Sequence, residues 1–98
     1  MSDPYLETIQ EQWANIVKLY MAFKKHNPVM LYDIQEHKLY AYPYREFRAE
    51  LSIKSQASLK DQYRSAAAQG SMVIFVRDNS KRKLVSYTMD IQEIASVH

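Results

Sequence analysis

Apolar and polar positions alternate along two stretches of the chain, and this pattern predicts two β-hairpins. Residues 29–44 read VMLYDIQEHKLYAYPY, and residues 74–89 read IFVRDNSKRKLVSYTM. The second stretch contains Asp78-Asn79-Ser80-Lys81, a turn sequence because Asp and Asn side chains bond their own backbone, and we expect equivalent geometry in the first stretch. Turns at these positions predict the cross-strand pairs Val29–Tyr42, Leu31–Tyr40, Ile74–Tyr87 and Val76–Val85.

The two predicted hairpins align without a gap at an offset of 45 residues. The identical pairs are Asp33/Asp78, Lys38/Lys83, Leu39/Leu84 and Tyr42/Tyr87. Any two hairpins share an alternating pattern, so these identities support a repeated architecture more strongly than a common origin. An internal duplication is therefore a hypothesis.

A helix is predicted for residues 4–25, before the first hairpin. Asp3 suits the N-cap and Pro4 the first helical position, where its missing N–H does no harm. Asn27 tolerates the left-handed conformation that closes a helix, and Pro28 prevents its continuation. The apolar stripe of this helix consists of Leu6, Ile9, Trp13, Ile16, Val17 and Tyr20.

A second helix is predicted for residues 58–69, between the hairpins. Ser58 followed by Asp61 resembles a capping box, and Gly70 occupies the position of a left-handed C-terminal residue. Its expected inner face consists of Leu59, Tyr63, Ala66 and Ala67. The pattern does not decide the secondary structure of two segments. Residues 45–51 either prolong a strand or start a helix, and residues 91–98 form either a strand extension or a short helix.

These elements predict an α+β fold with the order αββαββ in a single domain, residues 1–98. The simplest arrangement is one four-stranded antiparallel sheet with both helices on one face, related by a pseudo-twofold axis.

In that arrangement one face of the sheet stays uncovered although it is apolar. Such a surface exceeds the apolar patch that a monomer usually exposes, so we expect a second copy of the chain to cover it. The alternatives are a shifted register, or residues 45–51 and 91–98 folding across this face. The residues expected to mediate self-association are Met30, Tyr32, Leu39, Val73, Phe75 and Leu84.

Composition narrows the class of protein. The formal net charge of +2 is too small to indicate a polyanionic partner by itself. The chain has no cysteine, which excludes disulfides and thiolate metal sites. Neither a signal-peptide pattern nor a long apolar run is visible, so we expect a cytoplasmic protein without a membrane partner.

Candidate catalytic groups are few. His26, His37 and His98 fall at a helix end, in a turn and at the last position, where no metal site converges. Asp33, Glu36 and Lys38 form a D-x-x-E-x-K string like that of metal-dependent nucleases, but the string spans one turn. A turn Asp and a cross-strand Asp–Lys pair explain it more simply. We therefore expect no enzyme, no metal and no cofactor.

Two functions remain. The first is a small non-enzymatic protein-interaction or regulatory module that acts as a homodimer and has an unidentified protein partner. The alternative is a nucleic-acid-binding protein that combines a basic hairpin tip with aromatic side chains of the sheet. The contacts would then come from Arg77, Lys81, Arg82 and Lys83. We favour the interaction module.

Overall fold

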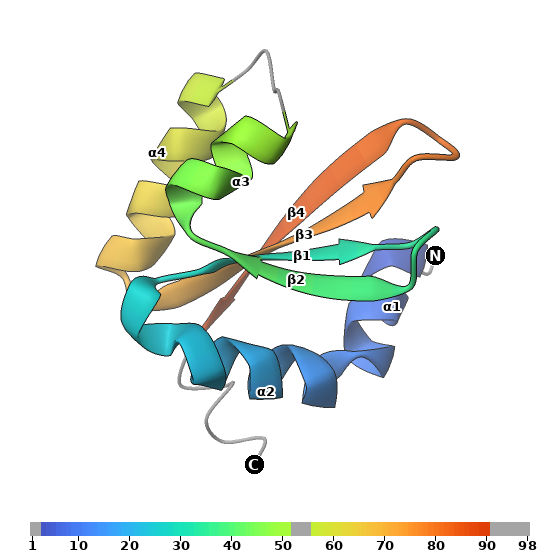
Figure 1. Ribbon diagram of the computed structural model, residues 1–98, viewed down its shortest axis with the longest axis horizontal. Coiled ribbons are helices and arrows are strands. Elements are labelled where there is room, and N and C mark those ends of the chain that lie inside the picture. The colour runs from blue at the N-terminus through green and yellow to red at the C-terminus, as the bar shows by residue number, and fades with distance from the viewer. Residues whose placement is uncertain (1–2, 52–55, 91–98) are drawn as a thin grey trace.

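The computed structural model describes residues 3–51 and 56–90, with side chains placed for 3–47 and 61–90. Four strands form one sheet with helices on both sides of it (Figure 1). The elements are α1 (Pro4–Glu11), α2 (Trp13–Phe23), the short 3₁₀ helix η1 (Lys24–His26), β1 (Val29–Asp33), β2 (Lys38–Tyr42), α3 (Tyr44–Leu51), α4 (Gln56–Ala68), β3 (Ser71–Asp78) and β4 (Lys83–Asp90).

Both hairpins have the register that the sequence predicts. The partners in β1 and β2 include Val29 with Tyr42 and Leu31 with Tyr40. In β3 and β4, Ile74 pairs with Tyr87 and Val76 with Val85. The α+β class is confirmed as well, because helices pack on a single four-stranded sheet.

The arrangement of the two hairpins differs from the prediction. The strand order is β2-β1-β3-β4, and the central strands β1 and β3 run parallel, so the sheet is mixed and not antiparallel. Residues 45–51, which sequence left open, belong to a helix. Because α3 leads away from the end of β2 and α4 leads back, β3 begins at the same end of the sheet as β1 (Figure 1). One helix between the hairpins would have delivered the chain to the opposite end.

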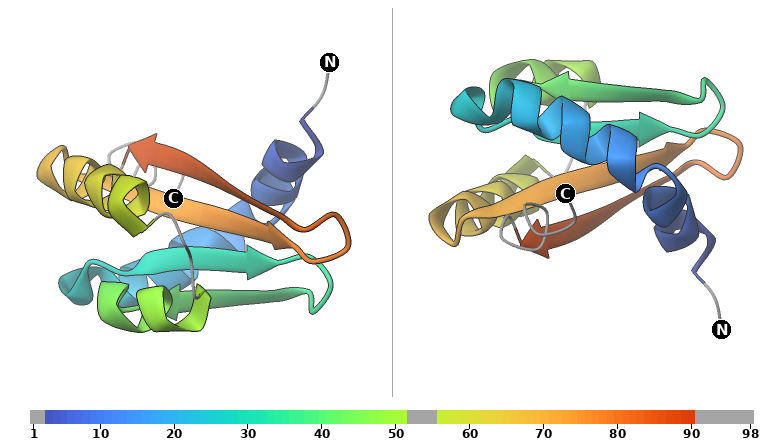
Figure 2. Two further views of the ribbon diagram at one scale, coloured as in Figure 1. Left: turned by 90° about the horizontal axis from the view of Figure 1, so that it is seen from above. Right: turned by 90° about the horizontal axis from the view of Figure 1, so that it is seen from below.

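The prediction that both helices lie on one face is also wrong. The helices α1 and α2 cover one face of the sheet, and α3 and α4 cover the other (Figure 2). Two buried clusters result. The α2-side core contains Ile9, Ile16, Val17, Tyr20, Met30, Met72, Ile74 and Val76. The α4-side core contains Val29, Leu31, Phe47, Ala66, Val73 and Phe75.

The first predicted helix is divided at Gln12. The backbone there leaves the helical range, with φ −93° and ψ 7°, and α2 starts at the next residue. Tertiary bonds hold the separated α1: the Tyr5 hydroxyl donates to Asp78, and the Tyr87 hydroxyl donates to Asp3. Asp3 is the N-cap, as predicted, and accepts from the N–H groups of Tyr5 and Leu6.

The ends of α4 agree in part with the sequence. Gly70 has φ +71° after the helix, the left-handed conformation expected there. The helix begins at Gln56, so Ser58 lies within it and the predicted capping box is wrong. On its inner face Ala66 is buried and Tyr63 is half-buried, whereas Ala67 is exposed. The predicted segment 91–98 lies outside the described residues.

Positions 45 residues apart lie on opposite faces of the sheet. Met30 belongs to the α2-side core and Phe75 to the α4-side core, while Leu31 and Val76 show the reverse. A rotation of 180° about an axis parallel to the strands keeps the strand direction and exchanges the two faces of the sheet. Such a rotation therefore relates the two hairpins. The pseudo-twofold axis predicted from sequence, which relates two helices on one face, is therefore wrong; the duplication itself stays a prediction.

Candidate functional site

The parallel pairing of β1 and β3 places both hairpin turns at one end of the sheet (Figure 2). The two tips are bonded to each other along the backbone, since the Ile34 N–H donates to the Arg77 carbonyl at 3.1 Å. Side chains from both turns then form a polar network, which we call the tip network. It consists of Tyr5, Asp33, Gln35, Arg77, Asp78 and Asn79.

Asp33 joins the two tips through its fully buried carboxylate. Its Oδ1 accepts the Glu36 backbone N–H at 2.9 Å, and its Oδ2 accepts from Arg77 Nε at 2.6 Å. Burial alone would raise the pKa of Asp33, but the Glu36 N–H and the Arg77 guanidinium together hold that pKa below its ordinary value. The carboxylate is thus ionised and structural.

Asp78 has the equivalent place in the second turn. Its Oδ1 accepts from the Gln35 side chain at 2.8 Å and from the backbone N–H groups of Ser80 and Lys81. Its Oδ2 accepts from the Tyr5 hydroxyl at 2.9 Å. The Gln35 bond, opposed by burial and reinforced by Tyr5 and the N–H groups, lowers the pKa of Asp78. The prediction that both Asp residues act as turn residues is confirmed.

The predicted nucleic-acid contacts divide into two kinds. Lys81, Arg82 and Lys83 are exposed at the tip of the second hairpin. Arg77 is half-buried and held by Asp33, so its charge is directed into the tip network. Sequence reasoning missed Lys38, which is exposed and lies at the same end only because β1 and β3 are parallel.

Both faces of the sheet carry buried clusters in the part of the chain that the structure describes, so the premise of an uncovered face is wrong. Met30, Tyr32, Val73 and Phe75 are each buried within the single chain, and Leu39 and Leu84 are half-buried. These residues also divide between the two faces: Met30 and Leu39 pack with the α2-side core, and Val73, Phe75 and Leu84 with the α4-side core. That face is covered because residues 45–51 belong to helix α3, which carries Phe47 onto the sheet. Self-association through another surface stays a prediction.

A shallow hollow of about 260 Å³ lies between the end of α2 and the edge strand β2. Its lining is Phe23, His26, Pro28, Ala41 and Pro43. We call it the Phe23 hollow. The Phe23 side chain is 46% exposed although it continues the three-residue spacing after Tyr20. From its spacing alone, Phe23 would be a core position. Periodicity cannot show that Phe23 is exposed, because it does not reveal whether the sheet still covers the last turn of the helix.

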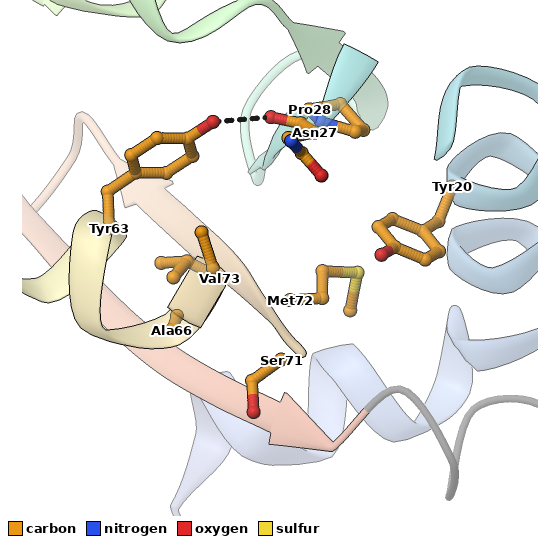
Figure 3. A pocket seen from close by; sticks show the side chains of 9 residues that line it. Tyr20, Asn27, Pro28, Tyr63, Ala66, Ser71, Met72 and Val73 are labelled. Carbon is orange, nitrogen blue, oxygen red and sulfur yellow. Dashed lines mark hydrogen bonds between the residues drawn. The ribbon is translucent and has the colours of Figure 1, made fainter. Parts of the chain in front are cut away.

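A second cavity lies between Tyr20 of α2, Tyr63 and Ala66 of α4, and Met72 and Val73 of β3 (Figure 3). Its volume is about 10 Å³, which is space for about one water molecule. The Tyr63 hydroxyl donates to the Asn27 carbonyl at 2.9 Å beside it and ties α4 to the loop after η1 (Figure 3). This cavity is too small for a substrate.

Within residues 3–51 and 56–90, no group of three or more His, Cys, Asp or Glu side chains is placed to hold a metal ion. The helices of the same residues include none with the length and apolar character needed to span a bilayer. Comparison of the chain with family models, with curated proteins and with solved structures gives no match.

Proposed function

We propose that this chain is a small non-enzymatic interaction module that binds a protein partner at the Phe23 hollow. The observation that carries the proposal is the exposure of Phe23 in an apolar hollow beside an edge strand. A large exposed aromatic side chain in a concave apolar surface is typical of the residues that anchor a protein interface. Burial of such a side chain contributes about 2 kcal/mol to association.

One basic residue, His26, lines the hollow, and two lysines precede it in the same short helix. Lys24, Lys25 and His26 form η1 directly after Phe23, and all three are exposed. An apolar centre with a polar, charged rim is the usual anatomy of a protein interface. The proposed partner therefore presents an apolar group that enters the hollow.

Site-specific crosslinking tests this function in cells that produce the protein. Position 23 receives the photoreactive p-benzoylphenylalanine, and Met21 is replaced by the same residue as the control. Met21 is equally exposed, at 46%, but lies about 200° around α2 from Phe23 and does not line the hollow. We expect a discrete adduct from position 23 and none from position 21.

The mass of the adduct identifies the partner class. An adduct of twice the chain mass identifies a second copy and supports a homodimer at this site. Equal adducts from both positions, or none from position 23, contradict the proposed function.

A second candidate function, nucleic-acid binding, is favoured by one observation. The parallel pairing of β1 with β3 gathers the exposed Lys38, Lys81, Arg82 and Lys83 at one end, while Asp33 and Asp78 are buried there and bonded inward. The tyrosines expected to stack on bases, Tyr40, Tyr42 and Tyr44, do not support it, since they are half-buried and pack with the α4-side core. This candidate therefore relies on phosphate contacts alone.

Fluorescence titration with labelled single-stranded and duplex oligonucleotides at two salt concentrations tests the second candidate. Phosphate contacts release counterions, so true binding weakens steeply between low and physiological salt. Charge reversal of Lys81, Arg82 and Lys83 to Glu abolishes it, whereas reversal of Lys24 and Lys25 at the opposite end of the sheet leaves it unchanged. Salt-independent binding, or equal effects of the two reversals, contradicts this candidate.

A further inference from the structure

We propose that the occupant of the Phe23 hollow is an extended acidic peptide that adds as a further strand to the outer edge of β2 and inserts one apolar side chain into the hollow. The inference rests on the proposed function and specifies its partner. Three features of the structure carry it: the free edge, the direction of Ala41 and the charge of η1.

Within residues 3–51 and 56–90, no strand pairs with the outer edge of β2. β2 is an outer strand of the described sheet, with β1 as its neighbour on the inner side (Figure 2). An outer strand presents a row of backbone N–H and C=O groups to solvent, and proteins usually protect such edges with charges or proline. In β2 the charged residue, Lys38, stands at the start, and four uncharged residues follow it up to Tyr42. Leu39, Tyr40 and Ala41 thus place no charge on this edge, which favours strand addition.

Ala41 connects this edge with the hollow. It pairs with Met30 and packs, like Met30, with the α2-side core. Side chains of directly opposed residues in adjacent strands point to the same face of a sheet. A peptide residue opposite Ala41 on the outer side therefore directs its side chain to the face where Ala41 and Phe23 line the hollow.

The hollow accommodates one large apolar side chain. Its volume of about 260 Å³ exceeds the roughly 150 Å³ of a cavity that binds benzene in a protein core. A small side chain such as that of alanine would leave most of this volume unfilled. The residue opposite Ala41 is accordingly aromatic or large and aliphatic.

The charge around the hollow selects an acidic peptide. η1 contributes two lysines, Lys24 and Lys25, and both are exposed. The first turn of α3 contributes one exposed charge of each sign, Arg45 and Glu46, which offset one another. The surplus is positive, so carboxylates on either side of the inserted apolar residue gain attraction.

Selection of peptides on the purified full chain tests the occupant. A phage-displayed library of random decapeptides is the probe, and the enriched sequences should combine one large apolar residue with flanking Asp or Glu. The tightest enriched peptide is then synthesised with a fluorescent label, and its affinity is measured by polarisation.

Matched variants test the place of binding. Lys24→Glu with Lys25→Glu should weaken the peptide about tenfold. Lys81→Glu with Lys83→Glu, the same charge change at the hairpin tips, should weaken it less than twofold. Phe23→Ala should reduce binding, and the equally exposed Met21→Ala should not.

Backbone methylation tests the strand addition. Only alternate peptide N–H groups face the neighbouring strand. One peptide carries N-methyl groups at the odd amides and a second at the even amides. One of the two should lose binding at least tenfold, and the other should retain it.

Four results overturn the inference: no enrichment, enrichment of basic or uncharged sequences, equal effects of the two methylated peptides, or equal effects of the two lysine pairs. A chain that is dimeric by light scattering and becomes monomeric on Phe23→Ala also overturns it, because the occupant is then a second copy. If position 23 crosslinks a protein partner but the peptides fail, the interaction module survives and only this inference is lost. If position 23 gives no adduct, the proposed function fails as well.

Discussion

The first hairpin, β1 and β2, and the second, β3 and β4, close with the same turn. In each, the Asp at the end of the first strand accepts the N–H three residues on: Asp33 from Glu36 and Asp78 from Lys81. In each, the fourth residue after the Asp is left-handed, since His37 and Arg82 both have φ +53°. The hairpins differ in what covers equivalent positions, because the second one is turned over. The turns thus depend on residues within four positions of the Asp. Which helix covers a given strand position depends instead on how the whole hairpin is oriented in the sheet.

The largest effect on stability is expected when one core side chain is removed on each face of the sheet. Phe75→Ala should reduce the free energy of unfolding by about 3–5 kcal/mol and Ile74→Ala by about 2–5 kcal/mol. Phe75 is 3% exposed against Phe47, and Ile74 is fully buried on the α2 side. Denaturant unfolding followed by circular dichroism measures both.

The exposed Thr88→Ala in β4 is the control and should change stability by less than about 0.5 kcal/mol. A cost that small for Phe75→Ala would show that the α4-side face is open. Phe75→Glu should give an unfolded chain here, whereas an uncovered face would leave it folded.

The next test separates the two turn carboxylates. Asp33→Asn keeps the turn bond but removes the charge that faces the half-buried Arg77. We expect a loss of about 2 kcal/mol in the free energy of unfolding. Asp78→Asn should cost less, because the side chains that donate to Asp78, those of Gln35 and Tyr5, are uncharged. Equal losses, measured by urea unfolding at neutral pH, would contradict this account of the tip network.

Acid affects both turns in the same direction. The fold lowers the pKa of Asp33 and of Asp78 from the ordinary value of 3.8. The stabilisation is therefore complete above that pH and is lost as the pH falls through each lower folded pKa. Thermal unfolding between pH 6 and pH 2 should show the loss, and Asp33→Asn should make it shallower.

A smaller effect is expected at the left-handed positions. His37→Gly and Arg82→Gly should each stabilise the protein by roughly 0.5–1 kcal/mol, since glycine avoids the left-handed penalty but is more flexible when unfolded. Ser80→Gly, in the same turn, relieves no left-handed residue and should destabilise. Thermal unfolding of the three variants measures the difference, and unequal gains for His37→Gly and Arg82→Gly would show that the turns are not equivalent.

The smallest effect concerns one tyrosine in each hairpin. The pKa of Tyr40 is raised to about 12 by its hydrogen bond to Glu36, followed by burial; that of Tyr87 is raised to about 12 by burial, followed by its bond to Asp3. Both raised values contribute stability below pH 10 that is lost as the pH rises through 12. Glu36→Gln should lower the pKa of Tyr40 toward 10 and leave Tyr87 unchanged. NMR titration of ¹³C-labelled tyrosine resolves the two.

Local patterns predicted much of the fold and little of the candidate site. The alternation of apolar residues gave the correct hairpin registers, and Asp33, Asp78 and Gly70 perform the turn and closing roles read from sequence. From sequence, Arg77 is a nucleic-acid contact of the alternative function, whereas in the structure Asp33 of the other hairpin holds it. A bond between residues 44 positions apart depends on strand order, which the local sequence does not contain.

The sequence by itself determined the elements whose physical causes act within a few residues: the paired strands, the Asp turns, and the helix ends at Asp3 and Gly70. Only the tertiary structure decided that β1 and β3 run parallel and that helices cover both faces of the sheet. The reason is the segment at residues 44–51, whose pattern suits a strand or a helix equally. In the structure this segment is helix α3, which places Phe47 against Phe75 and buries both rings. With α3 in this position, α4 leads the chain back to the end of the sheet where β1 also begins.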